Sequence, residues 1–189
     1  SIREGIKEAG FNPNFVQLIK DNTRKMTEEF MRLNEYLDVL IPRGSGRLIK
    51  SVSENANVPV ITTGEGNCHI YIDESADINM ALSIIENAKT QRTGVCNAME
   101  TLLVHSSIEV DFYKGLEDMI KKHNIKVYGC NKSKMYLPFI EDATEIEYDT
   151  EFLDMAFAMK IVDSVEESIE HIGKYSTGHS ESIITNKYN

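Results

Sequence analysis

The sequence predicts an α/β protein built on parallel sheets with flanking helices. Two observations support this prediction. Short apolar runs of strand length alternate with helical patterns along most of the chain, which is typical of βαβ units whose parallel sheet is covered on both faces. The chain also has 189 residues, of which 41% are hydrophobic and 26% charged, so it is long enough and apolar enough to bury a sizeable core.

The first third of the chain follows this alternation. Strands are predicted at 15–19, 37–41 and 58–62, and helices at 23–33 and 46–55. An amphipathic helical pattern with Ile2, Ile6 and Ala9 precedes them and stops at Gly10. We therefore expect this part to belong to a doubly wound domain, and we expect the chain to be a piece of a longer protein.

A second α/β part follows a boundary near "TTGEGN", residues 62–67, where glycines and polar residues separate two strand patterns. The two parts are therefore 1–64 and 65–189. In the second part, strands are predicted at 68–73, 101–106, 125–129, 155–163 and 180–185, and helices at 78–90, 109–123 and 164–175.

Capping residues mark two of these helices. Asp73, Ser75 and Asp77 are N-cap candidates for the helix at 78–90. Ser164, with Glu167 at the third helical position, predicts a capping box for the helix at 164–175. The stretch 131–150 carries a weaker signal, in which only "EIEY" at 145–148 suggests a strand.

Composition excludes several classes of function. The net charge is -10, without a basic run, so a nucleic-acid backbone would be repelled. No apolar stretch approaches the roughly 20 residues that span a bilayer, and the first residues do not form an export signal. The three cysteines and five histidines lack metal-ligand spacing, which favours reduced thiols in the cytoplasm and predicts no metal site.

Cys96 is the candidate nucleophile. It lies in the polar segment of "KTQRTGVCNAMETLLVH", residues 89–105, with Lys89 and Arg92 nearby and Gly94 allowing close backbone approach. Basic neighbours favour the thiolate, which is the reactive form. A lone cysteine in a globular protein is more often structural, however, and from local chemistry that interpretation stays open. Cys68 and Cys130, in apolar surroundings, are interpreted as structural.

Two other segments could contribute to a site. Arg43, Gly44, Ser45 and Gly46 form a turn between a predicted strand and a predicted helix, where backbone N–H groups and a helix dipole can bind phosphate. The pattern matches no dinucleotide or P-loop motif, so an ordinary turn is the alternative. His179 lies in a Gly- and Ser-rich turn before a strand, where site residues often occur.

Five long motifs together resemble one known family. They are "LDVLIPRGSGRLIKSV", "NVPVITTGEGNCHIYIDESADINMA", "NAKTQRTGVCNAMETLLVH", "YDTEFLDMAFAMKIVDSVEESIEHI" and "YSTGHSESIIT". In this order they resemble the gamma-glutamyl phosphate reductases, proline-biosynthesis enzymes of the aldehyde dehydrogenase superfamily. The resemblance covers the middle portion of the family. It implies that 1–64 is the C-terminal half of a nucleotide-binding domain and that 65–189 is a catalytic domain, which we expect to be incomplete.

The resemblance also implies a chemistry. Cys96 matches the nucleophile that forms a thioester with L-glutamate 5-phosphate, which NADPH then reduces to glutamate 5-semialdehyde. Arg43, Gly44, Ser45 and Gly46 match the turn beside the cofactor's phosphates, and Glu151 matches a glutamate on the nicotinamide ribose. Arg92 is our candidate for contact with the acyl phosphate, because charge redistributes there during the reaction, and His179 is a weaker candidate for substrate contact.

One departure from the oxidising members of the superfamily fits a reductase. Where they have the general-base glutamate that hydrolyses the thioester, this sequence has Thr62, which cannot act as a base near neutral pH. The resemblance further implies a homo-oligomer at full length and an association with glutamate 5-kinase. Two alternatives stay open: a fragment that folds without turnover, and another acylating aldehyde dehydrogenase, such as one that uses coenzyme A thioesters.

Overall fold

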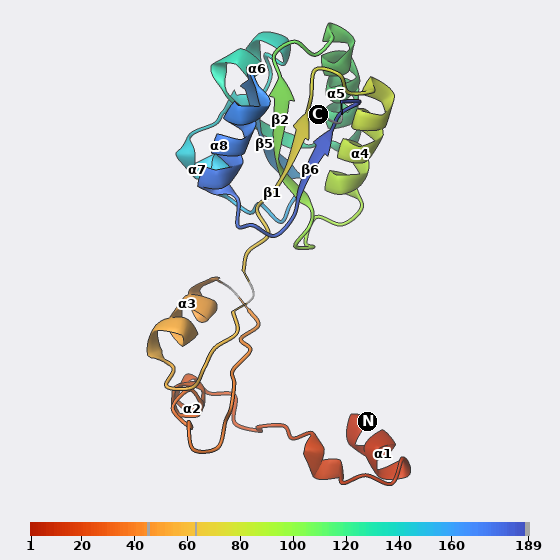
Figure 1. Cartoon of the computed structure of the whole chain (residues 1–189). Coiled ribbons are helices and arrows are strands. Elements are labelled where there is room, and N and C mark those ends of the chain that lie inside the picture. The colour runs from red at the N-terminus through yellow and green to blue at the C-terminus, as the bar shows by residue number, and fades with distance from the viewer. Residues whose placement is uncertain (45, 63, 188–189) are drawn as a thin grey trace. The chain divides into compact units, whose positions relative to one another are not determined.

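The computed structural model describes residues 1–44, 46–62 and 64–187. It divides into two compact units, Ser1–Thr63 and Gly64–Asn189 (Figure 1). In the described residues, no helix combines the length and the apolar character needed to cross a membrane.

The second unit is built on a parallel sheet, as the sequence predicts. In the part of the chain that the structure describes, the sheet has six strands in the order β4-β3-β5-β2-β1-β6, and every neighbouring pair is parallel. The strands are β1 (Cys68–Ile72), β2 (Met99–His105), β3 (Lys126–Gly129), β4 (Glu141–Asp142), β5 (Ala156–Val162) and β6 (Glu181–Ile184).

Helices cover both faces of this sheet (Figure 1). α4 (Ile78–Thr90) and α5 (Val110–His123) lie on one face, and α8 (Val165–Tyr175) and the short α7 (Glu145–Tyr148) lie on the other. α6 (Asn131–Tyr136) follows β3. The predicted N-caps are present: Asp77 accepts a hydrogen bond from the Met80 N–H at 2.8 Å, and Ser164 accepts one from the Glu167 N–H at 3.2 Å. The Glu167 carboxylate accepts from the Asp163 N–H at 2.9 Å, one residue before the N-cap, so the capping box predicted for α8 is only half formed.

The main hydrophobic core lies between the sheet and the face formed by α4 and α5. Its fully buried members include Ile72, Leu102 and Phe157 from the strands and Ile85 and Leu116 from the helices. Burying a side chain of this kind contributes roughly 1.5–3 kcal/mol. The opposite face has smaller clusters, in which Tyr148 of α7 and Tyr175 of α8 pack with Ala158 of β5. The sheet is therefore anchored mainly from the side of α4 and α5.

The first unit contains α1 (Ile2–Glu8), a short 3-10 helix η1 (Pro13–Phe15), α2 (Arg24–Phe30) and α3 (Gly46–Asn55). Its strand pairing, among the residues described, is an isolated parallel bridge between Leu40 and Val60. Of its apolar side chains that the structure describes, the buried ones are Met31, Val52 and Val58.

Three strand predictions in this unit need correction. The strand predicted at 15–19 is wrong: Phe15 ends η1, and the side chains of Phe15 and Leu18 are 73% and 86% exposed. The strands predicted at 37–41 and 58–62 are reduced to the Leu40–Val60 bridge. A β-strand is stabilised by pairing with neighbouring strands, and among the described residues these apolar runs have no partner strand beyond the single bridge.

The strand predicted at 145–148 is also wrong, because these residues form α7. Thr144 accepts a hydrogen bond from the Ile146 N–H at 3.2 Å, and Glu147 accepts one from the Thr144 N–H at 2.7 Å. This capping arrangement starts a helix, and it outweighs the alternating pattern of four residues.

We predict that residues 65–189 fold cooperatively when they are produced alone, whereas residues 1–62 do not. The second unit contains nearly all of the buried apolar side chains that the structure describes, and the first unit buries few. Urea unfolding followed by circular dichroism would show a sigmoidal transition for residues 65–189 and a gradual change for residues 1–62. A sigmoidal transition in both fragments, or in neither, would contradict the prediction.

Candidate functional site

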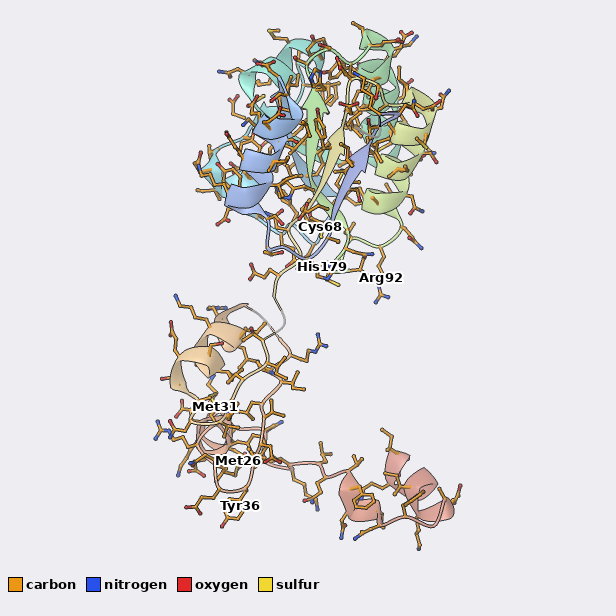
Figure 2. All side chains as sticks on the ribbon, in the orientation of Figure 1. Met26, Met31, Tyr36, Cys68, Arg92 and His179 are labelled. Carbon is orange, nitrogen blue, oxygen red and sulfur yellow. The ribbon has the colours of Figure 1, made fainter. Side chains whose placement is uncertain are left out.

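The predicted site residues of the second unit gather at the amino ends of the strands. Because β5, β2, β1 and β6 are neighbours and all parallel, the segments that precede them lie at one edge of the sheet. These segments carry Glu151 before β5, Arg92 and Cys96 before β2, and His179 before β6. Figure 2 shows Arg92, His179 and Cys68 at this end of the unit. Ligand sites in open α/β sheets usually lie at the carboxyl ends, so this edge is an unusual location.

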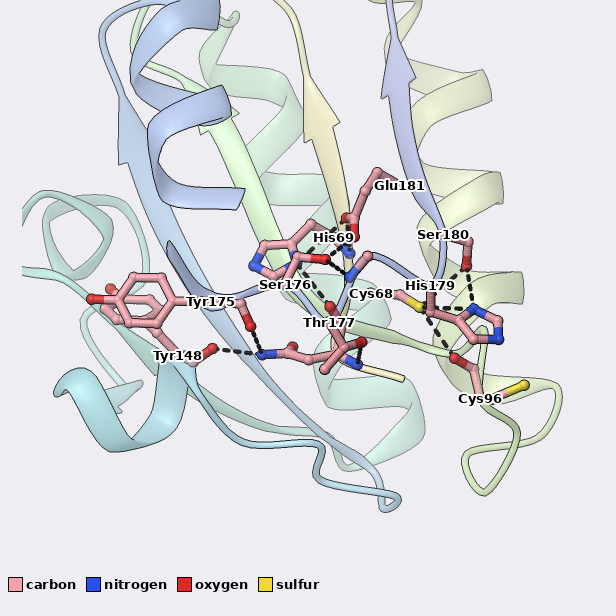
Figure 3. Close-up of polar contacts among 12 residues, drawn as sticks. Cys68, His69, Cys96, Tyr148, Tyr175, Ser176, Thr177, His179, Ser180 and Glu181 are labelled. Carbon is pink, nitrogen blue, oxygen red and sulfur yellow. Dashed lines mark hydrogen bonds and ion pairs between the residues drawn. The ribbon is translucent and has the colours of Figure 1, made fainter. Parts of the chain in front are cut away.

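Cys96 is exposed, and its backbone contacts Cys68, the first residue of β1. The Cys68 thiol donates a hydrogen bond to the Cys96 carbonyl oxygen at 3.1 Å. Burial raises the pKa of the Cys68 thiol, so this thiol keeps its proton and remains a donor. In Figure 3 the Cys96 carbonyl oxygen points toward Cys68 and the Cys96 sulfur points away from it. The backbone of the candidate nucleophile is thus fixed by a hydrogen bond, while its side chain is exposed to solvent.

Gly66 packs directly against the same peptide group. A Cβ atom placed on Gly66 would lie 1.9 Å from the Cys96 carbonyl oxygen and 2.8 Å from its Cα, closer than any side chain can approach. The Gly66 N–H donates a hydrogen bond to Oε1 of Glu151 at 2.8 Å. Gly66 therefore joins two predicted site residues, Cys96 and Glu151, which lie far apart in the sequence.

Asn67 holds the start of β1 in place. Its buried side-chain amide donates hydrogen bonds to the carbonyl oxygens of Tyr148 at 2.8 Å and Tyr175 at 3.0 Å. Its backbone N–H donates to the Thr177 hydroxyl at 3.1 Å. These bonds connect β1 to the ends of α7 and α8 and to the turn that carries His179 (Figure 3).

His179 is exposed, and its Nδ1 lies 3.1 Å from the Ser180 hydroxyl and 3.8 Å from the Cys68 sulfur. The Ser180 hydroxyl is also 3.2 Å from that sulfur. His179 and Cys96 therefore contact the same buried thiol, His179 through its ring and Cys96 through its carbonyl oxygen. The sequence predicts His179 as a substrate contact, and its position beside Cys68 is compatible with that prediction.

The two basic neighbours of Cys96 differ in role. Arg92 is exposed on the segment that carries Cys96. Lys89, which the sequence suggested as a second activating cation, is instead fully buried, and its ammonium donates a hydrogen bond to Glu100 at 2.7 Å. That part of the interpretation is corrected, because the charge of Lys89 is paired with a carboxylate.

The turn proposed for phosphate binding belongs to the first unit. It lies between Leu40, the bridge residue, and α3; the predicted helix is present, whereas the predicted strand is reduced to that bridge. Arg43 is exposed, and Gly44 adopts a positive φ of 155°. Gly46 is the first residue of α3. Ser45 lies outside the described residues.

Sequence reasoning missed the residues that hold the site together. The sequence assigns Gly66 and Asn67 only to a domain boundary; the structural role that it predicts for Cys68 is confirmed, but the contact of Cys68 with Cys96 is not predicted. The available signal was the strand-adjacent "GEGNC", where a glycine just before a buried strand indicates close backbone approach. The pairing of Lys89 with Glu100 had no local signal, because these residues are eleven positions apart across a loop.

Comparison with known proteins identifies the class. The sequence profile of the aldehyde dehydrogenase family matches residues 2–142, which is most of the chain. The chain belongs to the aldehyde dehydrogenase family. Within it, the chain is 52% identical over 188 residues to the gamma-glutamyl phosphate reductase of Clostridium kluyveri, covering 100% of this chain and 45% of that protein.

Two further relatives agree with this similarity. The gamma-glutamyl phosphate reductase of Listeria welshimeri is 50% identical over 187 residues, which cover 99% of this chain and 45% of that protein. The crystal structure of the gamma-glutamyl phosphate reductase of Thermotoga maritima superimposes with a TM-score of 0.92 at 49% identity, over 99% of this chain and 45% of that chain. This chain therefore spans a little under half the length of the curated relatives it matches.

Membership of the family implies a nicotinamide cofactor. The residues around the turn of the first unit fit its phosphates, because Arg43 and Arg47 are exposed cations and the first turn of α3 supplies backbone N–H groups. The sign of the charge and the donor set both suit a pyrophosphate.

We predict that Gly66→Ala displaces the Cys96 segment. The new methyl group would overlap the Cys96 carbonyl oxygen, so the thermal midpoint should fall and amide hydrogen exchange at 91–98 should increase. Gly94→Ala is the matched control, since Gly94 lies in the same segment and a Cβ there meets no atom within 4 Å. Equal effects of the two substitutions would show that the close approach of Gly66 is unimportant.

We predict that His171 makes folding sensitive to acid. Burial is the main reason that its pKa is lowered to about 3; His69, Lys160 and Lys174 lower it further, whereas Glu145 opposes them. Between pH about 6.5 and 3 the unfolded chain therefore binds a proton that the folded chain does not. As the pH is lowered through this range, the free energy of unfolding decreases by up to about 1.4 kcal/mol per pH unit.

Urea unfolding of the wild type and of His171→Phe at pH values from about 7.5 to 4.5 tests this, in a range above the titration of most carboxylates. The variant should lose less stability than the wild type over that range. Parallel pH dependences of the two proteins would contradict the assignment.

Proposed function

We propose that this protein supplies the catalytic cysteine of a gamma-glutamyl phosphate reductase, which converts L-glutamate 5-phosphate to L-glutamate 5-semialdehyde and phosphate with NADPH. The observation that carries the proposal is Cys96 itself, an exposed thiol whose backbone is fixed by Cys68 and Gly66. Identity of about half over the whole chain to relatives of that name supports the choice of substrate.

The reaction uses the thiolate of Cys96 as a nucleophile. Its sulfur attacks the acyl carbon of the substrate, the bond from that carbon to the phosphate oxygen breaks, and phosphate leaves with the bonding electrons. A thioester on Cys96 results. NADPH, when bound, supplies the hydride that reduces this thioester. The tetrahedral adduct on Cys96 then collapses, which breaks its C–S bond, releases the aldehyde and regenerates the thiolate.

Other residues position the reactants in this proposal. Arg92, exposed on the same segment, binds the acyl phosphate, and His179 contacts the substrate beside Cys68. Glu151, which already accepts the Gly66 N–H through Oε1, binds the nicotinamide ribose. Arg43, Gly44, Ser45 and Gly46 bind the cofactor's phosphates. Thr62, at the position where oxidising members of the superfamily have a general base, cannot activate water for hydrolysis of the thioester.

The wider setting of the reaction belongs to the same proposal and rests on the resemblance alone. It comprises proline biosynthesis in the cytoplasm, a homo-oligomer and contact with glutamate 5-kinase. The second candidate function is that of a chain that folds but does not catalyse the reaction. This alternative is favoured because the chain covers only 45% of each relative.

A chimera tests the chemistry separately from the length of the chain. These 189 residues replace the matching segment of the Thermotoga maritima relative, and the reverse reaction is followed as NADPH formation from glutamate semialdehyde, phosphate and NADP⁺. We expect turnover in the chimera and a loss of at least about a thousandfold in Cys96→Ala. Activity of the isolated chain then decides between the two candidates.

Arg92→Ala in the chimera tests the phosphate contact. We expect the KM for phosphate to rise about tenfold or more, since one charge-assisted contact is lost, while the KM for NADP⁺ stays unchanged. Full activity of Cys96→Ala would refute the mechanism. An unchanged KM for phosphate in Arg92→Ala would refute only the role of that arginine.

A further inference from the structure

The segment that carries Cys96 is bracketed by a buried ion pair. Lys89 lies in the last turn of α4, and Glu100 is the second residue of β2. The Lys89 Nζ and Glu100 Oε2 atoms are 2.7 Å apart, and both side chains are completely inaccessible to solvent. Among the ion pairs of the described residues, this one alone has both partners fully buried.

Stability alone is a poor explanation for such a pair. Removing two charges from water is costly, and apolar side chains of similar volume often stabilise a fold as well or better. The cost is visible here, because burial raises the pKa of Glu100 and lowers that of Lys89, while the contact between them opposes both shifts. What the ion pair provides beyond an apolar contact is a defined geometry, which holds the end of α4 to the start of β2.

The Glu100 carboxylate is held through one of its oxygens. Its Oε2 contacts Lys89, whereas its Oε1 is buried without a hydrogen-bond partner among the described residues, and the nearby backbone N–H groups of Leu153 and Phe152 lower its pKa. Leu153 has a φ of 54°, which is uncommon for a residue other than glycine and persists where neighbours impose it. Glu151 in turn accepts the Gly66 N–H, and Gly66 lies against the Cys96 carbonyl.

We propose that Lys89 and Glu100 are positioning residues for the reaction, which fix both ends of the segment 91–98 and so set the position of the Cys96 thiol. This inference rests on the proposed function for its catalytic meaning. The pair touches neither substrate nor cofactor in this proposal. It acts through the backbone, by joining the two ends of the segment to each other.

The test compares Lys89→Met/Glu100→Leu with the wild type. This double variant replaces the ion pair with apolar side chains, so the fold should persist. In the full chain we expect amide hydrogen exchange at 91–98 to rise about tenfold or more, while exchange in β5 stays unchanged. The matched control is Lys132→Met/Asp163→Leu, which removes an exposed ion pair and should leave exchange at 91–98 unaltered.

A single variant, Lys89→Met, tests separately whether the two buried charges are coupled. It leaves Glu100 buried without its partner, so its thermal midpoint should lie below that of the double variant. A midpoint equal to or above it would overturn the inference, because the two charges would then not be coupled.

Kinetics in the Thermotoga maritima chimera separates positioning from general support of the fold. We expect the double variant to lose about tenfold or more in kcat, with KM values within about threefold of the wild type. Unchanged exchange at 91–98, or an unchanged kcat, would overturn the inference. If the wild-type chimera has no activity, the proposed function fails, and the exchange measurement still decides whether the pair fixes the segment.

Discussion

The contact between the start of β1 and the peptide group of Cys96 is the constraint on which the rest of the site depends. Gly66 comes so close to the Cys96 carbonyl that a side chain at position 66 is excluded, and Cys68 donates a hydrogen bond to that carbonyl. Two residues of one short segment thus hold the same peptide group in place. Because the carbonyl is held toward the protein, the thiol on the same residue is left exposed to solvent. A cysteine thiolate is intrinsically a strong nucleophile, and a fixed position lets it attack an acyl carbon in the right orientation.

The topology explains why residues distant in sequence meet at this contact. β1 lies between β2 and β6, and β2 lies between β1 and β5, with all four strands parallel. The segments that precede them must therefore lie side by side at the amino edge. Asn67 binds the last residues of α7 and α8 and the Thr177 hydroxyl, and Gly66 binds Glu151. The sheet brings the segments together, and a few buried polar contacts then set their geometry.

The sequence predicted those parts of the fold that local patterns determine. β1, β2 and β5 are apolar runs buried on both faces, and α4 and α8 carry side-chain caps, so each was identified near its observed bounds. The strand predictions in the first unit were wrong because a strand forms only when it pairs with another, and the residues described there make one bridge. Cys96 and His179 are predicted from motifs, and the structure places both beside Cys68. Gly66 was not recognised as a contact of Cys96, and Lys89 was misread, because their partners lie across loops and only the folded chain reveals them.

The central claim is that Cys96, held by its backbone, carries the covalent intermediate. The most direct measurement is peptide mass spectrometry of the Thermotoga maritima chimera after incubation with glutamate semialdehyde and NADP⁺ in the absence of phosphate. Without phosphate the thioester cannot be resolved by the reverse reaction. The account predicts a glutamyl adduct on the peptide that contains Cys96 and its disappearance when phosphate is added. Turnover with no adduct on Cys96, or an adduct on Cys68 instead, would contradict it.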